Sequence, residues 1–439
     1  MKKNIRKIAL SVLMEAEASQ KYINLALSSH SLDSLDGKER ALLTSLVYTT
    51  VERKLTYDYY ISAISKRSES SVDPYTKNLL RIGLCQLIDI NSVPDFAAVN
   101  ESVSLARNSG ERSFVNGVLR TAARQKDNLP MPDENKNFRR YLSVKYSFPL
   151  AIVKHFDALY GREDTERLLD FFNNEKYTDI TVNTTKISIV EYKEKLKAAG
   201  VEFEENDLVP SSLRIKASVN PEKLGGFKDG LFFVQDRASA ISAVALGAET
   251  GHLIIDVCSA PGGKSFAAAI STHNKADVRS FDIHESKLSL VESGKDRLGL
   301  SSITVGHRDA LAPDESLVGK ADRVICDAPC SGLGVLGKKP DLRYKDSSSL
   351  TELPALQYDI LSASSLYLKP GGELVYSTCT LNPEENEGVV EKFISENPDF
   401  ELASFAVGEL EVNGGMLTLL PHIHGTDGFF VAKIRRKNQ

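Results

Sequence analysis

Two of the five cysteines follow strand-like apolar runs, where a side chain at a strand end can meet a substrate. Cys330 stands in Asp-Ala-Pro-Cys-Ser-Gly, residues 327–332, and Cys379 stands in Ser-Thr-Cys-Thr, residues 377–380. The proline, glycine and hydroxyl neighbours mark exposed loops, where functional residues concentrate. Because a thiolate is a strong nucleophile, the pair favours covalent catalysis, and the leading reaction is methylation of a pyrimidine carbon.

That reaction needs a thiol for a chemical reason. C5 of cytosine does not take up a methyl group unaided, but a thiolate that adds to C6 makes C5 enamine-like. Methyl transfer, loss of the C5 proton and expulsion of the thiolate then follow. A partner for N3 or the exocyclic amine of the base is also required, and Asp327 stands close to Cys330 in the chain. Cys85 and Cys326 lie inside apolar runs, so we expect them to be small buried hydrophobes.

A glycine-containing loop precedes both cysteine motifs and is the candidate cofactor site. The apolar run 253–257 is followed by Ala-Pro-Gly-Gly-Lys, residues 260–264, which opens a helical stretch. In open α/β sheets, ligands bind beyond the carboxyl ends of the strands. Glycines there let the backbone approach a ligand closely, and a helix amino end favours a negative group.

Three ligands compete for this loop. A phosphate-binding P-loop, typical of nucleotide hydrolases, requires a glycine six residues before the lysine, where Cys258 stands. The dinucleotide pattern Gly-x-Gly-x-x-Gly is absent. S-adenosylmethionine fits better, because the next strands end at Asp282, suited to ribose hydroxyls, and near Asp309, suited to the adenine. A tight turn with helix-capping aspartates explains each feature alone but not the ordered series with Asp256.

The elements that must position these loops follow an alternating pattern from about residue 236. Strands separated by helices predict a doubly wound, Rossmann-like α/β fold. The sequence Asn-Pro-Glu-Glu-Asn, residues 382–386, predicts a helix start with Asn382 as its cap, and its acids are expected to be structural. The predicted strands are residues 253–257, 278–281, 303–305, 323–326, 373–376 and 429–434, and the predicted helices are residues 236–246, 264–271, 287–298, 356–368 and 384–396.

The first part of the chain is different in character. Residues 1 to about 125 carry apolar side chains at helical spacing, and a polar, proline-bearing stretch at residues 129–137 predicts a linker. Residues 140–235 predict a small α+β domain, with helices at 149–159, 164–173 and 188–199 and strands at 180–183, 213–215 and 231–234. We therefore expect three domains: residues 1–130, 140–235 and 236–439.

Composition excludes several classes of protein. No apolar run reaches the ~18 residues that span a bilayer, and no secretion signal follows the basic residues 1–7. Five cysteines without a Cys-x-x-Cys pair argue against a disulfide framework and against zinc, so no metal is expected. Residues 1–140 hold 21 basic and 16 acidic side chains, a charge of +5, within a chain of net charge −5. We expect a cytoplasmic protein, without a membrane partner, whose front can hold nucleic acid.

The three motifs together resemble the RNA cytosine-5 methyltransferases, over about residues 233–386. In that family the cysteine of the Thr-Cys motif is the nucleophile, which corresponds to Cys379, and the cysteine of the Pro-Cys motif assists product release, which corresponds to Cys330. Pro-Asp-Leu-Arg, residues 340–343, and Gln235-Asp236 also match family positions. The resemblance implies that the methyl-donor site is lined by Cys258, Ser259, Ala260, Pro261, Gly262, Gly263, Lys264, Asp282, Asp309 and Asp327.

The front of the chain resembles the RNA-binding NusB fold, at residues 97–103 and 114–120. A NusB-like domain before this methyltransferase is the arrangement of the Sun/Fmu family of bacterial 16S ribosomal RNA cytosine-5 methyltransferases, whose RNA-contacting insert resembles residues 147–149, 160–161 and 182–183. This chain lacks tryptophan, and Thr181 stands where the insert usually has an arginine. RNA contacts at those two family positions are therefore not carried over.

The resulting hypothesis is a monomeric S-adenosylmethionine-dependent enzyme that methylates C5 of a cytosine in 16S ribosomal RNA, as free or early-assembly RNA. The target base must be unstacked to reach the thiols, which suits a loop nucleotide. Two alternatives stay open: the same chemistry on transfer RNA, and a catalytically inactive RNA-binding assembly factor. Retention of Cys330, Cys379 and the strand-end acids argues against the second.

Overall fold

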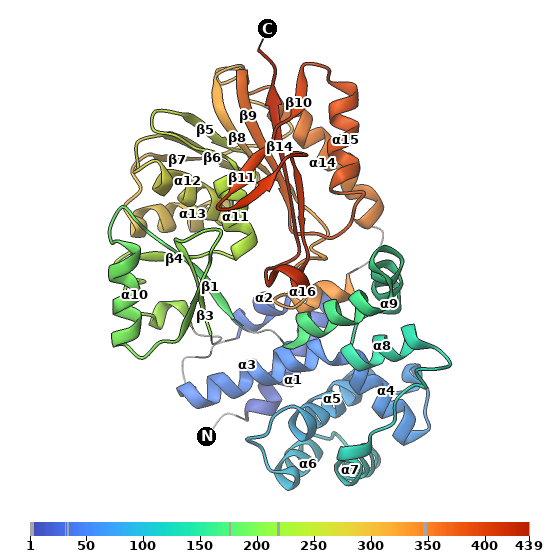
Figure 1. Cartoon of the computed structure of the whole chain (residues 1–439). Helices are drawn as coiled ribbons and strands as arrows, with labels where there is room; N and C mark the ends of the chain where they lie inside the picture. The colour runs from blue at the N-terminus through green and yellow to red at the C-terminus, as the bar shows by residue number, and fades with distance from the viewer. Residues whose placement is uncertain are drawn as a thin grey trace. The chain divides into compact units, whose positions relative to one another are not determined.

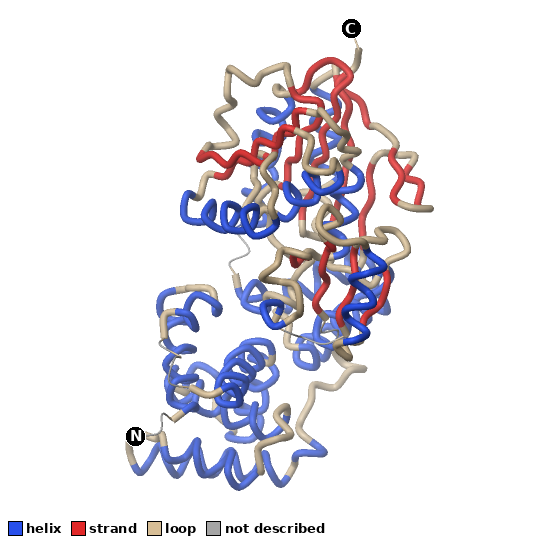
Figure 2. Tube along the Cα trace, turned by 90° about the vertical axis from the view of Figure 1, so that its left-hand side faces the viewer, coloured by secondary structure: helices blue, strands red, loops and turns tan. Residues whose placement is uncertain are grey.

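The computed structural model describes residues 4–30, 32, 35–174, 177–216, 220–345 and 349–438. The chain forms two compact units: unit 1 holds Met1–Asn173 and Leu336–Lys345, and unit 2 holds Asn174–Val335 and Asp346–Gln439. The described part of unit 1 is helical, and the strands lie in unit 2 (Figure 2). The predicted range 140–235 contributes to both units, and its division into a separate domain stays a prediction.

Unit 1 follows the helical periodicity of its sequence. Local capping fixes several helix starts: Asp36 and Glu39 form a reciprocal capping box, and the side chains of Asp73 and Asn108 accept hydrogen bonds from the first turns that follow them. The helices are α1 (Ile5–Ser19), α2 (Ile23–Ser28), α3 (Gly37–Glu52), α4 (Lys54–Ser65), α5 (Pro74–Ile88), α6 (Asp95–Ser104), α7 (Ser109–Arg124), α8 (Phe138–Tyr146) and α9 (Leu150–Asn174). Gly161 interrupts α9, which accounts for the two separate helices that the sequence predicts there.

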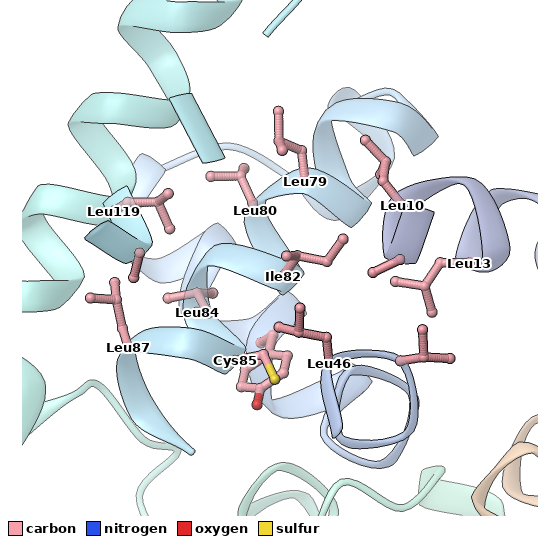
Figure 3. Packing of buried hydrophobic residues seen from close by; sticks show 14 of the residues in the cluster. Leu10, Leu13, Leu46, Leu79, Leu80, Ile82, Leu84, Cys85, Leu87 and Leu119 are labelled. Carbon is pink, nitrogen blue, oxygen red and sulfur yellow. The ribbon is translucent and has the colours of Figure 1, made fainter. Parts of the chain in front are cut away.

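Helix α5 is the centre of the unit 1 core. Its side chains point to several neighbouring helices, and Figure 3 shows Leu80 and Leu84 on the side of Leu119, with Ile82 on the side of Leu10. Burial on all sides explains why apolar residues occur throughout this helix rather than along one stripe. Cys85 is fully buried among them, which confirms its predicted role as a small hydrophobe.

A late piece of the chain completes unit 1. The short 3-10 helix Pro340–Tyr344 packs against α3. The Arg343 side chain is buried and lies 3.8 Å over the ring of Phe148. Its guanidinium donates to the carbonyl oxygens of Glu52 and Leu336, each at 3.2 Å, and to Asn173 Oδ1 at 2.8 Å. Burial lowers the pKa of Arg343 to about 10, which disfavours the charged form. The carbonyl and amide oxygens around the guanidinium offset part of this cost.

Unit 2 begins with a small antiparallel sheet. Its strand order is β2 (Phe203–Glu205), β3 (Ser212–Ile215), β1 (Thr178–Val182) and β4 (Phe232–Val234). Helix α10 (Ile189–Ala198) packs on it through Tyr192 and Leu196, and the Ser188 side chain caps this helix, which the sequence predicts at residues 188–199.

The larger sheet has the order β10-β14-β9-β8-β5-β6-β7, with β13 paired to β14. The five strands β7, β6, β5, β8 and β9 run parallel, and β14 pairs antiparallel with β9. The strands are β5 (Leu253–Asp256), β6 (Asp277–Asp282), β7 (Ile303–His307), β8 (Ala321–Asp327), β9 (Leu368–Thr378), β10 (Phe400–Leu402), β13 (Met416–Leu419) and β14 (Phe429–Arg436). The order reverses between β5 and β8, so the loops after these two strands meet at the switch point where α/β folds bind ligands.

Helices cover both faces of this sheet (Figure 1). Alternate strand residues face opposite sides: Ile254 and Ile325 join one apolar cluster, whereas Ile255 and Val324 join the other. The first cluster includes residues of α11 (Arg237–Ala245), α12 (Gly263–Ser271) and α13 (Glu285–Leu298), and the second includes residues of α14 (Ser349–Ser365) and α15 (Glu387–Glu396). This confirms the predicted doubly wound α/β class.

The structure adds elements that the sequence did not predict. These are strand β2, the hairpin β11 (Phe405–Val407) and β12 (Leu410–Val412), strands β10 and β13, and the short helix α16 (Pro421–His424). They are short, and strands of three or four residues carry too little periodicity to be distinguished from loops.

Candidate active site

The glycine loop joins β5 to α12. Gly262 has a φ of +110°, a conformation that favours glycine, and a Cβ built there lies 2.3 Å from Phe266 Cζ. The Ser259 amide donates to the Phe281 carbonyl at 2.8 Å, and the Gly262 amide donates to the Ser259 carbonyl at 2.6 Å. The loop is therefore a tight backbone turn anchored to the next strand, as its sequence predicts.

The carboxylates at the ends of β5 and β6 bond to the glycine loop and to the helix that follows it. Asp256 is buried and accepts a 2.6 Å hydrogen bond from Ser265, which in turn accepts one from Ser280. Burial raises the pKa of Asp256 to about 7, against the opposing effects of the Ser265 hydroxyl and the Lys264 cation. Asp282 accepts from the Ala260 amide at 3.1 Å, so it fixes the loop as well as standing at its strand end.

The residues around this loop fit a polar ligand such as S-adenosylmethionine. Two buried oxygens beside it, Asp256 Oδ1 and Ser259 Oγ, have no hydrogen-bond partner in the described ranges. Buried polar atoms without a partner are costly and usually indicate a missing ligand or water. Asp309 differs from Asp256 and Asp282 because its side chain is exposed. It follows β7 and accepts a hydrogen bond from the Leu311 amide at 3.0 Å. Its contact with an adenine stays a prediction.

Lys264 joins the glycine loop to the first cysteine motif. Its buried ammonium lies 2.7 Å from Asp327 Oδ2. The other Asp327 oxygen accepts a 2.7 Å hydrogen bond from Ser377, its register partner on the neighbouring strand. A carboxylate held from both sides has a fixed orientation, which is what recognition of a base edge requires.

The two candidate thiols meet although they lie 49 positions apart in the sequence. Cys330 follows β8, Cys379 follows β9, and their Sγ atoms lie 3.3 Å apart. Both side chains are half-buried. The hydrogen bond with Cys379, reinforced by burial and by the charge of Glu385, raises the pKa of the Cys330 thiol well above its usual value. Cys330 is therefore a neutral S–H group near neutral pH.

The remaining cysteines differ from this pair. Cys326 is fully buried, and burial raises the pKa of its thiol to about 12, which confirms the predicted apolar role. Cys258 is half-buried in the glycine loop, and burial raises the pKa of its thiol well above the usual value. Neither is therefore prepared as a nucleophile.

One prediction for the Cys379 loop is wrong. Residues 382–386 do not begin a helix: they form a turn, and α15 starts at Glu387. Asn386 has φ −106° and ψ −100°, outside the helical region, because its side chain turns inward to bond Thr378 and the Thr380 carbonyl. Propensity favoured a helix start here, but buried side-chain hydrogen bonds override it.

Sequence reasoning also missed residues that link the site to the rest of unit 2. Gln235 accepts from Thr181 at 2.9 Å and donates to the Gly263 carbonyl at 3.1 Å, so it connects strand β1 of the small sheet to the glycine loop. Thr181, which replaces an expected arginine, is thus occupied in a buried hydrogen bond. The match of Gln235-Asp236 to family positions was the sequence signal for Gln235, but it indicated no role.

No helix in the described ranges combines the length and apolar character that a membrane crossing requires. Within those ranges, the side chains also form no group of three or more His, Cys, Asp or Glu residues that suits a metal ion.

Three family profiles match successive parts of the chain. The family described as "16S rRNA methyltransferase RsmB/F" matches residues 243–435, the NusB family matches residues 3–124, and the ferredoxin-like domain of RsmF/B-like methyltransferases matches residues 148–222. The first match contains the glycine loop and both cysteine motifs.

Individual proteins are similar over the whole length. The probable ribosomal RNA small subunit methyltransferase B of Bacillus subtilis is 36% identical over 99% of both chains. The probable ribosomal RNA small subunit methyltransferase B of a Synechocystis species is 34% identical over 98% of this chain and 99% of its own. The solved structure of a protein titled PH0851 has a TM-score of 0.80 at 27% identity, covering 99% of this chain and 98% of its own.

Proposed function

The chain belongs to the RsmB/F family of 16S ribosomal RNA methyltransferases, and on that premise we propose that Cys379 is its nucleophile, with Cys330 as the assisting thiol. It is an S-adenosylmethionine-dependent enzyme that methylates C5 of cytosine in 16S ribosomal RNA. The single observation that supports the proposed roles is the 3.3 Å approach of the two thiols, in the loops that follow the paired strand ends Asp327 and Ser377.

The reaction begins on the base. The Cys379 thiolate forms a bond to C6, and the electron pair of the C5=C6 double bond makes C5 nucleophilic. Asp327, held by Lys264 and Ser377, accepts a hydrogen bond from the exocyclic amine of the cytosine and so orients the base. S-adenosylmethionine supplies the electrophilic methyl group that C5 receives, and the glycine loop with Asp282 is the proposed place for it.

The second half of the reaction returns the enzyme to its starting state. The C5 proton passes to water, the C5=C6 double bond re-forms, and the electron pair of the S–C6 bond returns to Cys379. Because the pKa of Cys330 is raised, first by its hydrogen bond with Cys379, Cys330 retains its proton. Its S–H group is in place to donate to the departing thiolate, which makes that thiolate a better leaving group.

The substrate is handled as a single extruded nucleotide. Duplex RNA does not expose C6 of a stacked cytosine, so an unpaired or extruded base suits the half-buried thiols. We assign the enzyme to the cytoplasm, as a monomer that acts on free or early-assembly 16S ribosomal RNA. Bisulfite sequencing of ribosomal RNA from cells with and without the gene identifies the modified cytosine, and a change confined to transfer RNA would contradict this assignment.

The thiol roles are tested by two alanine variants. Cys379→Ala should lower methylation by at least ~1000-fold and abolish the RNA–protein adduct on a denaturing gel, because the nucleophile is lost. Cys330→Ala should still form the adduct and should accumulate it, because expulsion of Cys379 is slowed. Cys85→Ala, in the core of unit 1, is the control and should methylate normally. Normal methylation by Cys379→Ala would overturn the assignment.

A further inference from the structure

Glu385 is a fully buried carboxylate in the turn that precedes α15. Its neighbour Glu384 is exposed, as expected of acids on a surface turn. Burying a carboxylate is costly unless several donors satisfy it, so a buried acid at this position requires an explanation beyond helix capping. Because α15 begins only at Glu387, Glu385 has no capping role in that helix.

The donors to Glu385 come from three separate segments. Oε2 accepts from the Ser331 backbone amide at 2.9 Å and from Gln357 Nε2 at 3.0 Å. Oε1 accepts from Asn382 Nδ2 at 3.1 Å and faces the Thr380 hydroxyl at 3.5 Å. Ser331 directly follows Cys330, and Thr380 directly follows Cys379, so one carboxylate holds the residues next to both thiols.

Further bonds reinforce the same junction. Gln357 also donates to the Pro329 carbonyl at 2.8 Å, on the other side of Cys330. The hydroxyls of Ser331 and Thr380 lie 2.7 Å apart. The Gly334 amide donates to the Cys379 carbonyl at 2.9 Å. The backbone on both sides of Cys330 is thus tied to the Cys379 loop, with Glu385 at the centre of the network.

We propose that Glu385 is a positioning residue for the methylation reaction: its carboxylate fixes the Cys330 loop against the Cys379 loop and so holds the assisting thiol beside the nucleophile. The inference rests on the proposed function, because the placement of Cys330 by Glu385 affects the reaction only if Cys330 assists the release of Cys379. Glu385 touches neither the base nor the methyl donor in this scheme, and it acts through the placement of Cys330.

The charge of Glu385 supports the same role. It contributes to the raised pKa of Cys330, after the larger effects of the Cys379 hydrogen bond and burial. A carboxylate at this place therefore favours the protonated form of Cys330, the form that donates to a departing thiolate. Position and protonation of the assisting thiol are both linked to one residue.

The variant Glu385→Gln separates this role from simple support of the fold. An amide of the same shape presents an NH2 group to one pair of donors, so the bonds to either Ser331 and Gln357 or Asn382 and Thr380 are lost. We expect adduct formation to continue while adduct resolution slows by about tenfold or more. The ratio of adduct to methylated product should therefore rise, as in Cys330→Ala.

The experiment follows adduct and labelled product in single-turnover reactions of the full chain with 16S ribosomal RNA. Glu384→Gln, an exposed acid one residue away, is the matched control and should keep the wild-type ratio. Gln357→Leu removes a donor to Oε2 and to the Pro329 carbonyl, and should raise the ratio by a smaller factor. It replaces Glu385→Gln as the decisive variant if that protein does not fold.

The outcomes are distinct. A raised ratio in Glu385→Gln or Gln357→Leu, with the control unchanged, supports the proposal. A parallel loss of adduct and product, or a wild-type ratio in the folded variants, overturns it. If wild-type protein forms no Cys379-dependent adduct at all, the proposed function itself fails, and the result is recognised before any variant is compared.

Discussion

The glycine loop after β5 and the two cysteine loops after β8 and β9 lie at the same end of one sheet but are stabilised by different contacts. Backbone amides hold the glycine loop, through Ser259, Gly262 and the nearby strand end at Asp282. Side chains hold the cysteine loops, and Glu385 bonds to Ser331, which lies 54 positions away in the chain. Apart from the Lys264–Asp327 ion pair, the backbone amides of the cofactor loop are thus held within 22 positions of the chain. The thiol side depends on side-chain contacts that span as many as 54 positions.

The difference follows from what each loop must do. A cofactor loop needs close approach of the backbone, which glycine and a tight turn provide within a few residues. A pair of thiols must be kept at one separation while bonds to one of them form and break, which requires a preorganised surrounding. The pairing of β8 with β9 and the contacts between the two loops together control that separation.

The largest expected effect lies on the cofactor side, in the response of stability to pH. Burial raises the pKa of Asp256 to about 7 in the folded protein, above the ordinary value of roughly 3.9. Its contribution to stability is therefore present below about pH 4 and is lost as the pH rises through 7. Relative to wild type, Asp256→Asn should gain about 4 kcal/mol in the free energy of unfolding across that window.

Urea denaturation at a series of pH values measures this difference. Asp277→Asn, an exposed acid on the adjacent strand β6, is the control and should follow the wild-type pH dependence. Parallel curves for Asp256→Asn and wild type would show that the carboxyl is not destabilised by burial. The glycine loop would then rest on a carboxylate as fully satisfied as Glu385, and the contrast between the two sides would weaken.

The next effect tests whether the glycine loop is as local as its contacts suggest. Gly262→Ala places a methyl group 2.3 Å from Phe266 Cζ at a φ of +110°. We expect about 30-fold weaker binding of S-adenosylmethionine, roughly 2 kcal/mol, with normal formation of the thiol pair. Isothermal titration calorimetry measures the affinity. Gly414→Ala, where a Cβ meets open space, is the control; equal affinities for the two variants would count against the assigned loop.

The smallest effect concerns the link between the thiols. The hydrogen bond with Cys379 is the largest cause of the raised pKa of Cys330. In Cys379→Ala, the midpoint of the pH profile for alkylation of Cys330 by iodoacetamide should move to lower pH, so that Cys330 reacts faster at a fixed pH. Peptide-resolved mass spectrometry follows Cys330 alone. Cys85→Ala should leave the profile in place, and an unchanged midpoint in Cys379→Ala would mean that the thiols are independent.

The same contrast explains how much the sequence could predict. The doubly wound sheet, the glycine loop, the position of both cysteines at strand ends and the burial of Cys85 and Cys326 follow from periodicity and short motifs. Each of these features depends on residues close together in the chain. The strand-end pattern also predicted the region where Asp282 and Asp327 lie.

Features that depend on distant partners were not predicted. Pro-Asp-Leu-Arg was noticed as a motif without a role, because the carbonyls of unit 1 that bind Arg343 belong to residues 196 to 291 positions earlier. Glu385 was assigned to a helix start, since its partner Ser331 cannot be identified by spacing. Short-range propensity describes neither case, because the deciding hydrogen bonds form only when separate segments of the chain come together.

The segment Leu336–Lys345 has a consequence for how the protein is made. The 162 residues 174–335 separate it from the helices that it completes. During translation, the carbonyls of Glu52, Tyr146 and Ser147 emerge long before the Arg343 that they bind. Domains generally begin to fold in the order of synthesis. Unit 1 therefore acquires the buried Arg343 only after the ribosome has produced β8 and the Cys330 loop. Completion of unit 1 therefore follows synthesis of the first cysteine motif.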